Sequence, residues 1–227
     1  MTVKTPERLD AHVRAAIADI AAGRLVIVTD DEDRENEGDL IGAAAAMGRA
    51  EVAFMVRHTT GILCAAMDPA RCAGFDLPPM VQGNQDPNGT AYTVSCDAAA
   101  CGTGVSAQDR LLTLRTLAGH PDPAALRRPG HMFPLRAQPG GVLARPGHTE
   151  AAWELANRAG LPGVGVLAEL VNDDGSMMRG PALQAFASRH GLRQLAITEL
   201  IAWRLAGEGA APLASQAVPD PMMDEVA

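Results

Sequence analysis

Short apolar segments alternate with amphipathic stretches through the second half of the chain, and this alternation limits the folds that the sequence can adopt. The segments at 164–170 and 195–197 are apolar and short enough to be buried strands. Stretches with helical spacing follow or precede them at 149–159, 181–190 and 198–205. Strands and helices in this order pack as layers on a sheet. The pattern therefore predicts an α+β fold, a single-domain layered α/β sandwich around a mixed β-sheet.

The first half of the chain adds elements of the same two kinds. Thr5-Pro6 has the pattern of an N-cap and first helical residue, and Gly23 ends the helix that follows. Ser106 and Asp109 have the spacing of a capping box, which predicts a helix from there to about residue 117. Apolar stretches of strand length lie at 25–28, 40–46, 62–67 and 90–95, a helix is expected at 50–58, and the segment at 76–89 reads as a loop.

We expect one domain over residues 1–206 and a disordered C-terminal tail over 207–227, which is acidic, rich in Ala and Pro, and without an apolar period. The net charge is −8 and no basic stripe is present, so nucleic acid is not an expected partner. No apolar run approaches the roughly 18 residues that a membrane span needs. The polar N-terminus and four cysteines without a metal or disulfide spacing indicate a cytoplasmic protein.

Among the 19 basic residues Lys4 is the only lysine. Schiff-base and pyridoxal phosphate enzymes need a desolvated lysine in the core, and phosphate-binding loops of the G-x-x-x-x-G-K type need one too. These classes are therefore excluded. A protein of this composition would bind a sugar phosphate through arginine, backbone amides and a metal ion.

The segment from Asp30 to Asp39 carries seven carboxylates in ten residues. Such a run is usually a solvated loop. Here it lies between two apolar strands, which directs it to a strand end, where open α/β sheets bind ligands. Carboxylates gathered there favour a hard divalent cation such as Mg²⁺.

The tripeptide Pro-Gly-His occurs twice, at 129–131 and 146–148, and each copy follows an arginine. A Pro-Gly turn would fix the backbone before the imidazole and so position it as a ligand or a catalytic group. Arg145 and Thr149 flank the second copy and could hold a phosphate together. The alternatives are that both histidines are structural hydrogen-bonding groups and that Arg145 pairs with an acid.

Glu169 ends the apolar segment at 164–170. A carboxylate there either has a structural partner or serves as a base, since burial would favour its use in proton abstraction. The residues alone leave both interpretations open.

Several segments together resemble the 3,4-dihydroxy-2-butanone-4-phosphate synthase family, over about residues 24–204. The resemblance rests on D-D-E-D-R-E-N-E-G-D at 30–39, R-H-T-T-G-I-L-C at 57–64, T-G-V-S-A-Q-D-R at 103–110, R-P-G-H-M-F-P-L-R-A at 128–137, G-G-V-L-A-R-P-G-H-T-E-A at 140–151 and the stretch at 169–175. It implies that the domain is catalytic and converts D-ribulose 5-phosphate to L-3,4-dihydroxy-2-butanone 4-phosphate and formate for riboflavin biosynthesis. The family reaction enolises the pentulose, removes the C1 hydroxyl, shifts the carbon skeleton with the help of a metal, and releases C4 as formate.

The resemblance also implies a role for individual residues. Glu35 and His148 would bind the metal, with Glu37 in support, and His131 and Glu169 would be the acid–base pair. The residues expected to contact substrate are Arg34, Glu35, Asp39, Cys64, Thr103, Asp109, Arg145, Pro146, Gly147, His148, Thr149 and Glu169. The implied cofactor is Mg²⁺ or Mn²⁺, with two ions in each site. The implied assembly is a homodimer with shared active sites.

Two positions depart from the family pattern, Gln85 in the loop at 76–89 and Gly102. They favour an alternative, a paralogue that acts on a pentulose phosphate in another pathway. A non-catalytic binding protein would lack at least one of Glu35, His131, His148 and Glu169, and all four are present. Many relatives carry a fused cyclohydrolase domain, which we do not expect here because its cysteine cluster is missing from this sequence.

Overall fold

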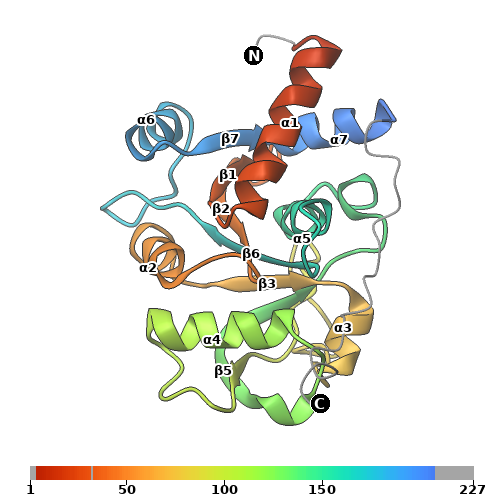
Figure 1. Ribbon diagram of the computed structural model, residues 1–227, viewed down its shortest axis with the longest axis vertical. Coiled ribbons are helices and arrows are strands. Elements are labelled where there is room, and N and C mark those ends of the chain that lie inside the picture. Colours follow the sequence, from red (N-terminus) through yellow and green to blue (C-terminus); the bar gives the residue numbers. More distant parts are fainter. Residues whose placement is uncertain (1–3, 32, 208–227) are drawn as a thin grey trace, which may run out of the picture.

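The computed structural model describes residues 4–31 and 33–207, and these contain one seven-stranded sheet with the order β4-β5-β3-β6-β2-β1-β7 (Figure 1). β1 is parallel to β7 and β3 to β5, whereas the other neighbours are antiparallel. The strands are β1 (Val26–Thr29), β2 (Gly38–Ala43), β3 (Cys64–Met67), β4 (Cys96–Ala98), β5 (Leu126–Arg136), β6 (Val164–Glu169) and β7 (Arg193–Ala196).

Helices cover both faces of this sheet, and the strand residues alternate between them. Val26 and Val28 pack in one buried cluster with side chains of α1, α5 and α7, while Ile27 and Leu40 pack in the other with α2, α4 and α6. Figure 1 shows the sheet between the two helical layers, and α3 lies beside β5. The helices are α1 (Pro6–Ala21), α2 (Arg49–His58), α3 (Pro69–Gly74), α4 (Ala107–Ala118), α5 (His148–Arg158), α6 (Pro181–His190) and α7 (Ile197–Leu205), with short 3₁₀ helices η1 (Pro123–Ala125) and η2 (Gly141–Leu143). The prediction of an α+β sandwich around a mixed sheet is confirmed.

Local signals place several helix ends where the sequence predicts them. Ser106 caps α4 and accepts a hydrogen bond from the Asp109 amide at 3.0 Å. Gly23 follows α1 with a φ of 78°, a left-handed conformation that glycine adopts without steric cost. The helix predicted at 181–190 is α6.

Two predictions in the middle of the chain are wrong. The segment at 90–95 is not a strand, because it pairs only through isolated bridges such as Tyr92 with Leu135. The first Pro-Gly-His copy, at 129–131, is not a turn but lies inside the long strand β5. Pro129 is tolerated there because β4 pairs with β5 across a register shift, where a missing N–H breaks no regular ladder. At Gly130 any side chain would collide with the backbone of Cys96.

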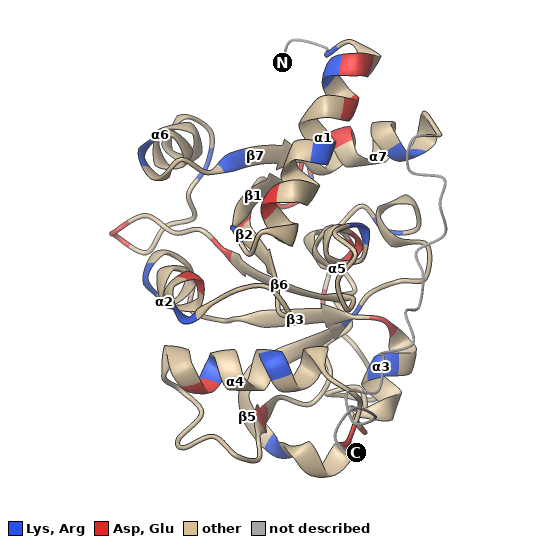
Figure 2. Cartoon of the chain, viewed as in Figure 1, with Lys and Arg blue, Asp and Glu red and all other residues tan. Residues whose placement is uncertain are grey.

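None of the helices within the described residues has the length and hydropathy to span a bilayer. Figure 2 shows acidic and basic residues interspersed along α1, α2 and α4. The tail predicted at 207–227 lies outside the described residues except for Gly207.

Candidate active site

The sheet topology gathers acidic residues at one edge. β1 and β6 are both antiparallel to β2, so their carboxyl ends lie at the same edge of the sheet. The acidic segment 30–37 follows β1, and Glu169 ends β6 directly opposite Asp39 of β2. The expectation that the acidic run lies at a strand end is therefore confirmed.

Three strand residues at this edge share the face that α5 covers. Cys64 belongs to the buried cluster on that face, as do Ile41 and Leu167. Asp39 and Glu169 are each two positions along the strand from one of these apolar residues, and side chains two apart point to the same side. The N-terminus of α5 adds His148 and Thr149 beside them.

These groups surround a cavity of about 120 Å³. Its lining comprises Arg34, Glu35, Glu37, Asp39, Cys64, Asp86, Thr90, Tyr92, Leu135, Arg145, His148, Thr149, Leu167 and Glu169. Most residues that the sequence singled out therefore converge, although they come from four separate parts of the chain. Asp86, Thr90 and Tyr92 also line the cavity, although no functional signal in the sequence marked them.

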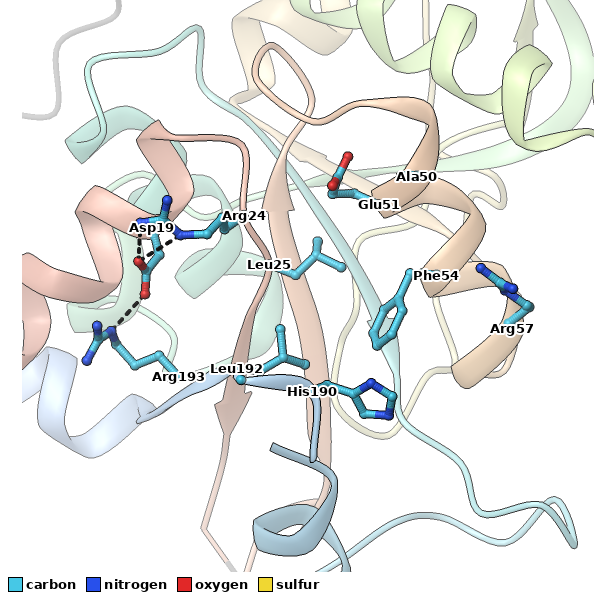
Figure 3. Close-up of a pocket in the computed structure, with 11 residues that line it drawn as sticks. Asp19, Arg24, Leu25, Ala50, Glu51, Phe54, Arg57, His190, Leu192 and Arg193 are labelled. Carbon is cyan, nitrogen blue, oxygen red and sulfur yellow. Dashed lines mark hydrogen bonds and ion pairs between the residues drawn. The ribbon is translucent and has the colours of Figure 1, made fainter. Parts of the chain in front are cut away.

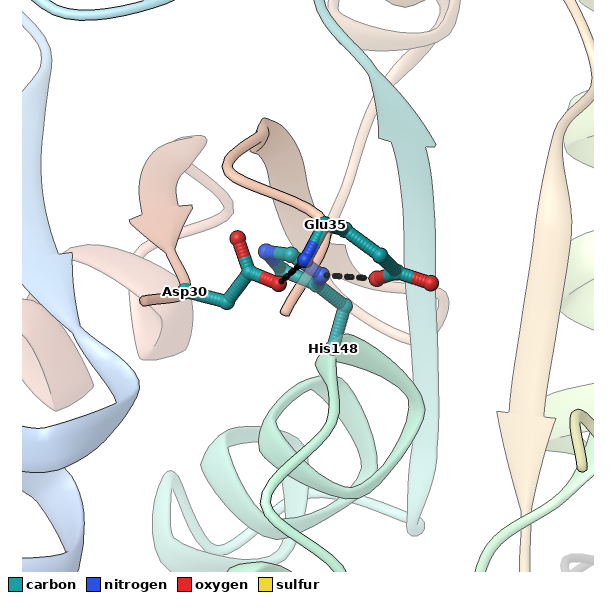
Figure 4. A group of neighbouring side chains, drawn as sticks. All are labelled: Asp30, Glu35 and His148. Carbon is teal, nitrogen blue, oxygen red and sulfur yellow. Dashed lines mark hydrogen bonds and ion pairs between the residues drawn. The ribbon is translucent and has the colours of Figure 1, made fainter. Parts of the chain in front are cut away.

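His148 is the buried centre of this group. Its Nδ1 lies 3.5 Å from Glu35 Oε2, and its Nε2 lies 3.9 Å from Asp39 Oδ1 (Figure 4). Burial disfavours the imidazolium, but the carboxylates of Asp39 and Glu35 outweigh this effect and raise the pKa of His148 to about 9. The hydrogen bond with His148, supported by Arg34, lowers the pKa of Glu35 to about 2. Burial, with neighbouring carboxylates adding to it, raises the pKa of Asp39 to about 7.

The donor set fits a hard divalent cation. Asp39 Oδ1 and His148 Nε2 are buried without a hydrogen-bond partner, and such groups are normally satisfied. The ligand atoms of Asp30, Glu35 and His148 all lie within 4.8 Å of one another. Oxygen ligands of this kind, together with an imidazole, suit Mg²⁺ or Mn²⁺.

Asp30 has a different role from the other acids. Its carboxylate accepts hydrogen bonds from the Glu35 amide at 3.0 Å, the Glu37 amide at 2.9 Å and Arg34 Nη1 at 3.0 Å. These contacts shape the acidic segment so that Glu35 reaches His148 (Figure 4). The sequence did not single out Asp30, because it is one of seven similar carboxylates.

Arg145 is shared between a structural contact and the cavity. Its Nη1 donates to the buried carboxylate of Glu150 at 2.6 Å, while Nη2 donates to the Asn88 carbonyl at 3.1 Å. The first backbone N–H groups of α5, next to Thr149, have no acceptor within the helix. An arginine beside a helix N-terminus can hold a phosphate. At Gly147 a side chain would collide with Arg145.

His131 lies outside this cavity, and so do Thr103 and Asp109. The Nδ1 of His131 is 2.8 Å from Asp97 Oδ2, and its backbone amide donates to Asp97 Oδ1 at 2.9 Å. The imidazole is 48% exposed, so its other nitrogen is accessible. Asp97 orients the ring, as a carboxylate orients a general base, yet no sequence signal marked it.

Asp109 organises the loop beside this pair, where its carboxylate accepts a hydrogen bond from the Gly102 amide at 3.1 Å. A side chain at Gly104, the neighbour of Thr103, would meet His131 and Asp97. The structure therefore divides the expected residues into two groups, the cavity group and a His131 group made of Thr103, Asp109 and His131, to which it adds Asp97.

A larger cavity of about 660 Å³ lies elsewhere, between α2 and the start of β7 (Figure 3). Its charged groups are partnered, since Asp19 accepts hydrogen bonds from Arg24 at 2.6 Å and Arg193 at 2.8 Å. Phe54 and His190 on its opposite side pack on one another with ring centroids 5.1 Å apart. The smaller cavity is the stronger candidate because two of its buried polar atoms, Asp39 Oδ1 and His148 Nε2, lack a hydrogen-bond partner.

Comparison with known proteins connects this arrangement to one family. The sequence profile described as 3,4-dihydroxy-2-butanone 4-phosphate synthase matches residues 14–203. The riboflavin biosynthesis protein RibBA of Salinispora arenicola is 53% identical over 207 residues, covering 90% of this chain and 49% of that protein. RibBA of Mycobacterium tuberculosis is 54% identical over 204 residues, covering 87% of this chain and 47% of that protein. The chain thus spans about half the length of these relatives.

The fold is also found among solved structures. A crystal structure of 3,4-dihydroxy-2-butanone 4-phosphate synthase in complex with two magnesium ions superposes with a TM-score of 0.83. It is 45% identical in sequence, and the match covers 87% of this chain and 98% of that one. RibBX from A. baumannii, a two-domain 3,4-dihydroxy-2-butanone 4-phosphate synthase, gives a TM-score of 0.82 at 42% identity, covering 86% of this chain and 58% of that one.

Proposed function

Since the chain belongs to the 3,4-dihydroxy-2-butanone 4-phosphate synthase family, we propose that it converts D-ribulose 5-phosphate to L-3,4-dihydroxy-2-butanone 4-phosphate and formate in riboflavin biosynthesis. One observation carries the proposal. Buried cation-binding groups, a carboxylate base and an arginine at a helix N-terminus line the same small cavity. A phosphorylated sugar needs all three. No observation favours the paralogue, because Gln85 and Gly102 do not line the cavity.

The phosphate end of the substrate is assigned to Arg145 and the start of α5. Nη2 of Arg145 now donates to the Asn88 carbonyl, an acceptor that a phosphate oxygen can replace. The backbone amides at the N-terminus of α5 and the hydroxyl of Thr149 would add neutral donors. Arg34 and Asp39, which also line the cavity, would contact the sugar hydroxyls.

Glu169 is assigned as the base that enolises the sugar. One of its oxygens accepts a hydrogen bond from the Thr60 hydroxyl at 2.6 Å, which fixes the carboxylate and leaves the other oxygen to take a proton. A carboxylate that ends a strand and lines the cavity can take the proton from the substrate carbon.

Glu35 and His148 are assigned as metal ligands, with Glu37 nearby. A bound Mg²⁺ or Mn²⁺ would act as a Lewis acid toward the sugar oxygens. Two ions in each site agree with the two magnesium ions of the related crystal structure. His148 must bind as the neutral imidazole, and the cation would replace the proton that Asp39 and Glu35 hold on the ring.

The separation of His131 from the cavity supports a homodimer with shared sites. An exposed imidazole oriented by Asp97 is equipped to exchange protons, but the cavity of its own chain lacks it. In a two-fold dimer, a residue that one subunit contributes to its partner's site is matched by the same residue of the partner in its own site. We assign His131 to the partner's active site, together with Thr103 and Asp109, and Cys64 and Glu169 to the home site.

The enzyme is expected in the cytoplasm, where its four cysteines remain reduced. All four are buried and none forms a disulfide. Burial raises the pKa of the Cys64 thiol, so Cys64 lines the pocket as a neutral, apolar group.

The direct test is incubation of the purified chain with ribulose 5-phosphate and Mg²⁺, with formate followed enzymatically and the four-carbon phosphate identified by mass spectrometry. Stoichiometric formate and four-carbon phosphate are expected. Consumption of the sugar phosphate without formate would indicate the paralogue, and no consumption with either cation would reject the proposed function.

A further inference from the structure

Arg179, which belongs to none of the sequence motifs, contacts the acidic segment that follows β1. Arg179 lies in the connection between β6 and α6. Its Nε donates to the Asn36 carbonyl at 2.6 Å, and its Nη2 donates to the Glu35 carbonyl at 3.3 Å. Nη2 also lies 3.6 Å from Glu37 Oε1. One guanidinium therefore contacts three consecutive residues, the first of which is the assigned metal ligand.

The backbone that carries Arg179 is anchored to the sheet. Met178 is only 7% exposed, and its amide donates to the Leu170 carbonyl at 2.9 Å. Leu170 in turn donates its amide to the Gly38 carbonyl at 2.8 Å, directly after the acidic segment. Arg179 thus reaches the segment from a base that is fixed to the same edge of the sheet.

The acidic segment needs support on this side. Asp30 accepts hydrogen bonds from the amides of Glu35 and Glu37, whereas the carbonyls of Glu35 and Asn36 accept theirs from Arg179. Asn36 has a φ of 53°, a left-handed conformation that a residue with a Cβ adopts at a steric cost. A guanidinium presents its N–H groups as a rigid fork, which matches two neighbouring acceptors, whereas an ammonium is a point donor.

We propose that Arg179 is a positioning residue for the metal site, because it fixes the backbone of Glu35 and Asn36 and so aims the Glu35 carboxylate at His148 before a cation arrives. The proposal rests on the proposed function for the assignment of Glu35. Without the guanidinium the segment samples other conformations. The apparent cation affinity then falls in proportion to the population of the conformation that binds the cation. The chemistry, once the cation is bound, is unaffected.

The test compares Arg179→Ala, Arg179→Lys and the control Arg189→Ala in the full chain. Arg189 lies in the last turn of α6, and the described residues give it no hydrogen bond or ion pair. Mg²⁺ binding is measured by calorimetry, Mn²⁺ binding by electron paramagnetic resonance, and formate release as a function of Mg²⁺. For Arg179→Ala we expect cation affinity to fall on the order of tenfold, kcat at saturating cation to stay within about twofold, and the unfolding temperature to change little.

Chemical rescue separates positioning from a general loss of stability. Millimolar guanidinium chloride should restore most of the cation affinity of Arg179→Ala and leave Arg189→Ala and the wild type unchanged. Arg179→Lys should stay impaired, because its point charge cannot bridge two carbonyls. The proposal is overturned if Arg179→Ala binds cations like Arg189→Ala, or if guanidinium does not reduce its defect. Failure of the proposed function is seen separately, as a wild-type chain that releases no formate.

Discussion

Mixing two inactive variants tests whether His131 serves the partner's site. Glu35→Ala damages the cavity group, and His131→Ala damages the exposed imidazole, which lies outside the cavity of its own chain. In a mixed dimer with shared sites, one pocket collects both lesions and the other has an intact Glu35 and an intact His131. Random exchange makes half of the dimers mixed, each with one working site in two, so about a quarter of the wild-type activity should return.

The structure supplies a matched control for this experiment. Glu35 and Glu169 line the same cavity of one chain, so mixing Glu35→Ala with Glu169→Ala combines two lesions that belong to the home site.

 The Glu35 and Glu169 pair should return no activity. Each mixed dimer carries Glu35→Ala in one cavity and Glu169→Ala in the other, so both cavities keep a lesion. Asp97→Ala mixed with His131→Ala should be silent for the same reason. These two pairs are therefore negative controls for the exchange of Glu35→Ala with His131→Ala.

The assay is formate release after the variants have been mixed and incubated, with subunit exchange confirmed by native mass spectrometry of differently tagged chains. Return of activity for Glu35→Ala with His131→Ala, and for neither control pair, supports the shared site. If that mixture stays silent although exchange is complete, His131 and Glu35 do not belong to complementary halves of one pocket. Activity from the Glu35 and Glu169 pair would contradict the assignment of both residues to one cavity.

Four further outcomes follow from the site and its surroundings. Exhaustive chelation should stop formate release and added Mg²⁺ should restore it, and turnover that survives chelation would refute the metal assignment. Glu169→Gln should lower kcat on the order of 10²-fold with little change in KM, whereas a rise in KM alone would make Glu169 a binding residue. Arg145→Ala should raise KM and also lower the unfolding temperature, because the buried Glu150 loses its partner; unchanged KM would leave only the structural role. Burial raises the pKa of Asp19, but hydrogen bonds from two arginines outweigh it and hold that pKa below its ordinary value. The Asp19 carboxylate therefore stabilises the fold at pH values above its ordinary pKa, and this stabilisation is lost as the pH falls through the lowered pKa of the folded state. Asp19→Asn should consequently lower the unfolding temperature at neutral pH and not in strong acid. An equal drop in unfolding temperature at neutral pH and in strong acid would contradict this prediction.

The fold could be predicted where local signals and burial agree. α4 begins after Ser106 and α6 occupies its predicted range, because capping groups and apolar spacing act within a few residues. β6 was recognisable because both of its faces are covered, which makes it continuously apolar. β5 was missed because its first half alternates exposed and partly buried polar residues and contains Pro129, and its pairing with β4 depends on residues far away in the chain.

The site was predictable only for residues whose motif limits their position. Glu35, His148 and Glu169 lie at strand or helix ends that the sequence marks, and they meet at the expected edge of the sheet. Asp97 has no such mark, since its contact with His131 spans 34 residues. Arg179 contacts Asn36 across 143 residues. Contacts of this kind arise from packing, and one sequence alone does not specify them.

The pairing of Asp39 with Glu169 connects the fold to the proposed chemistry. They are direct partners on antiparallel strands, where like charges destabilise a sheet. Asp39 is 3% exposed, and its raised pKa records the cost of ionising it there. A protonated His148 offsets part of that cost, since its Nε2 lies 3.9 Å from Asp39 Oδ1. A divalent cation would offset more, because it brings two charges to Asp39 Oδ1, which lacks a hydrogen-bond donor. The pairing of Asp39 with Glu169 is therefore unfavourable without a cation, yet it places the carboxylates where a cation can bind. Cation binding should stabilise the fold, and more so the tighter the cation binds.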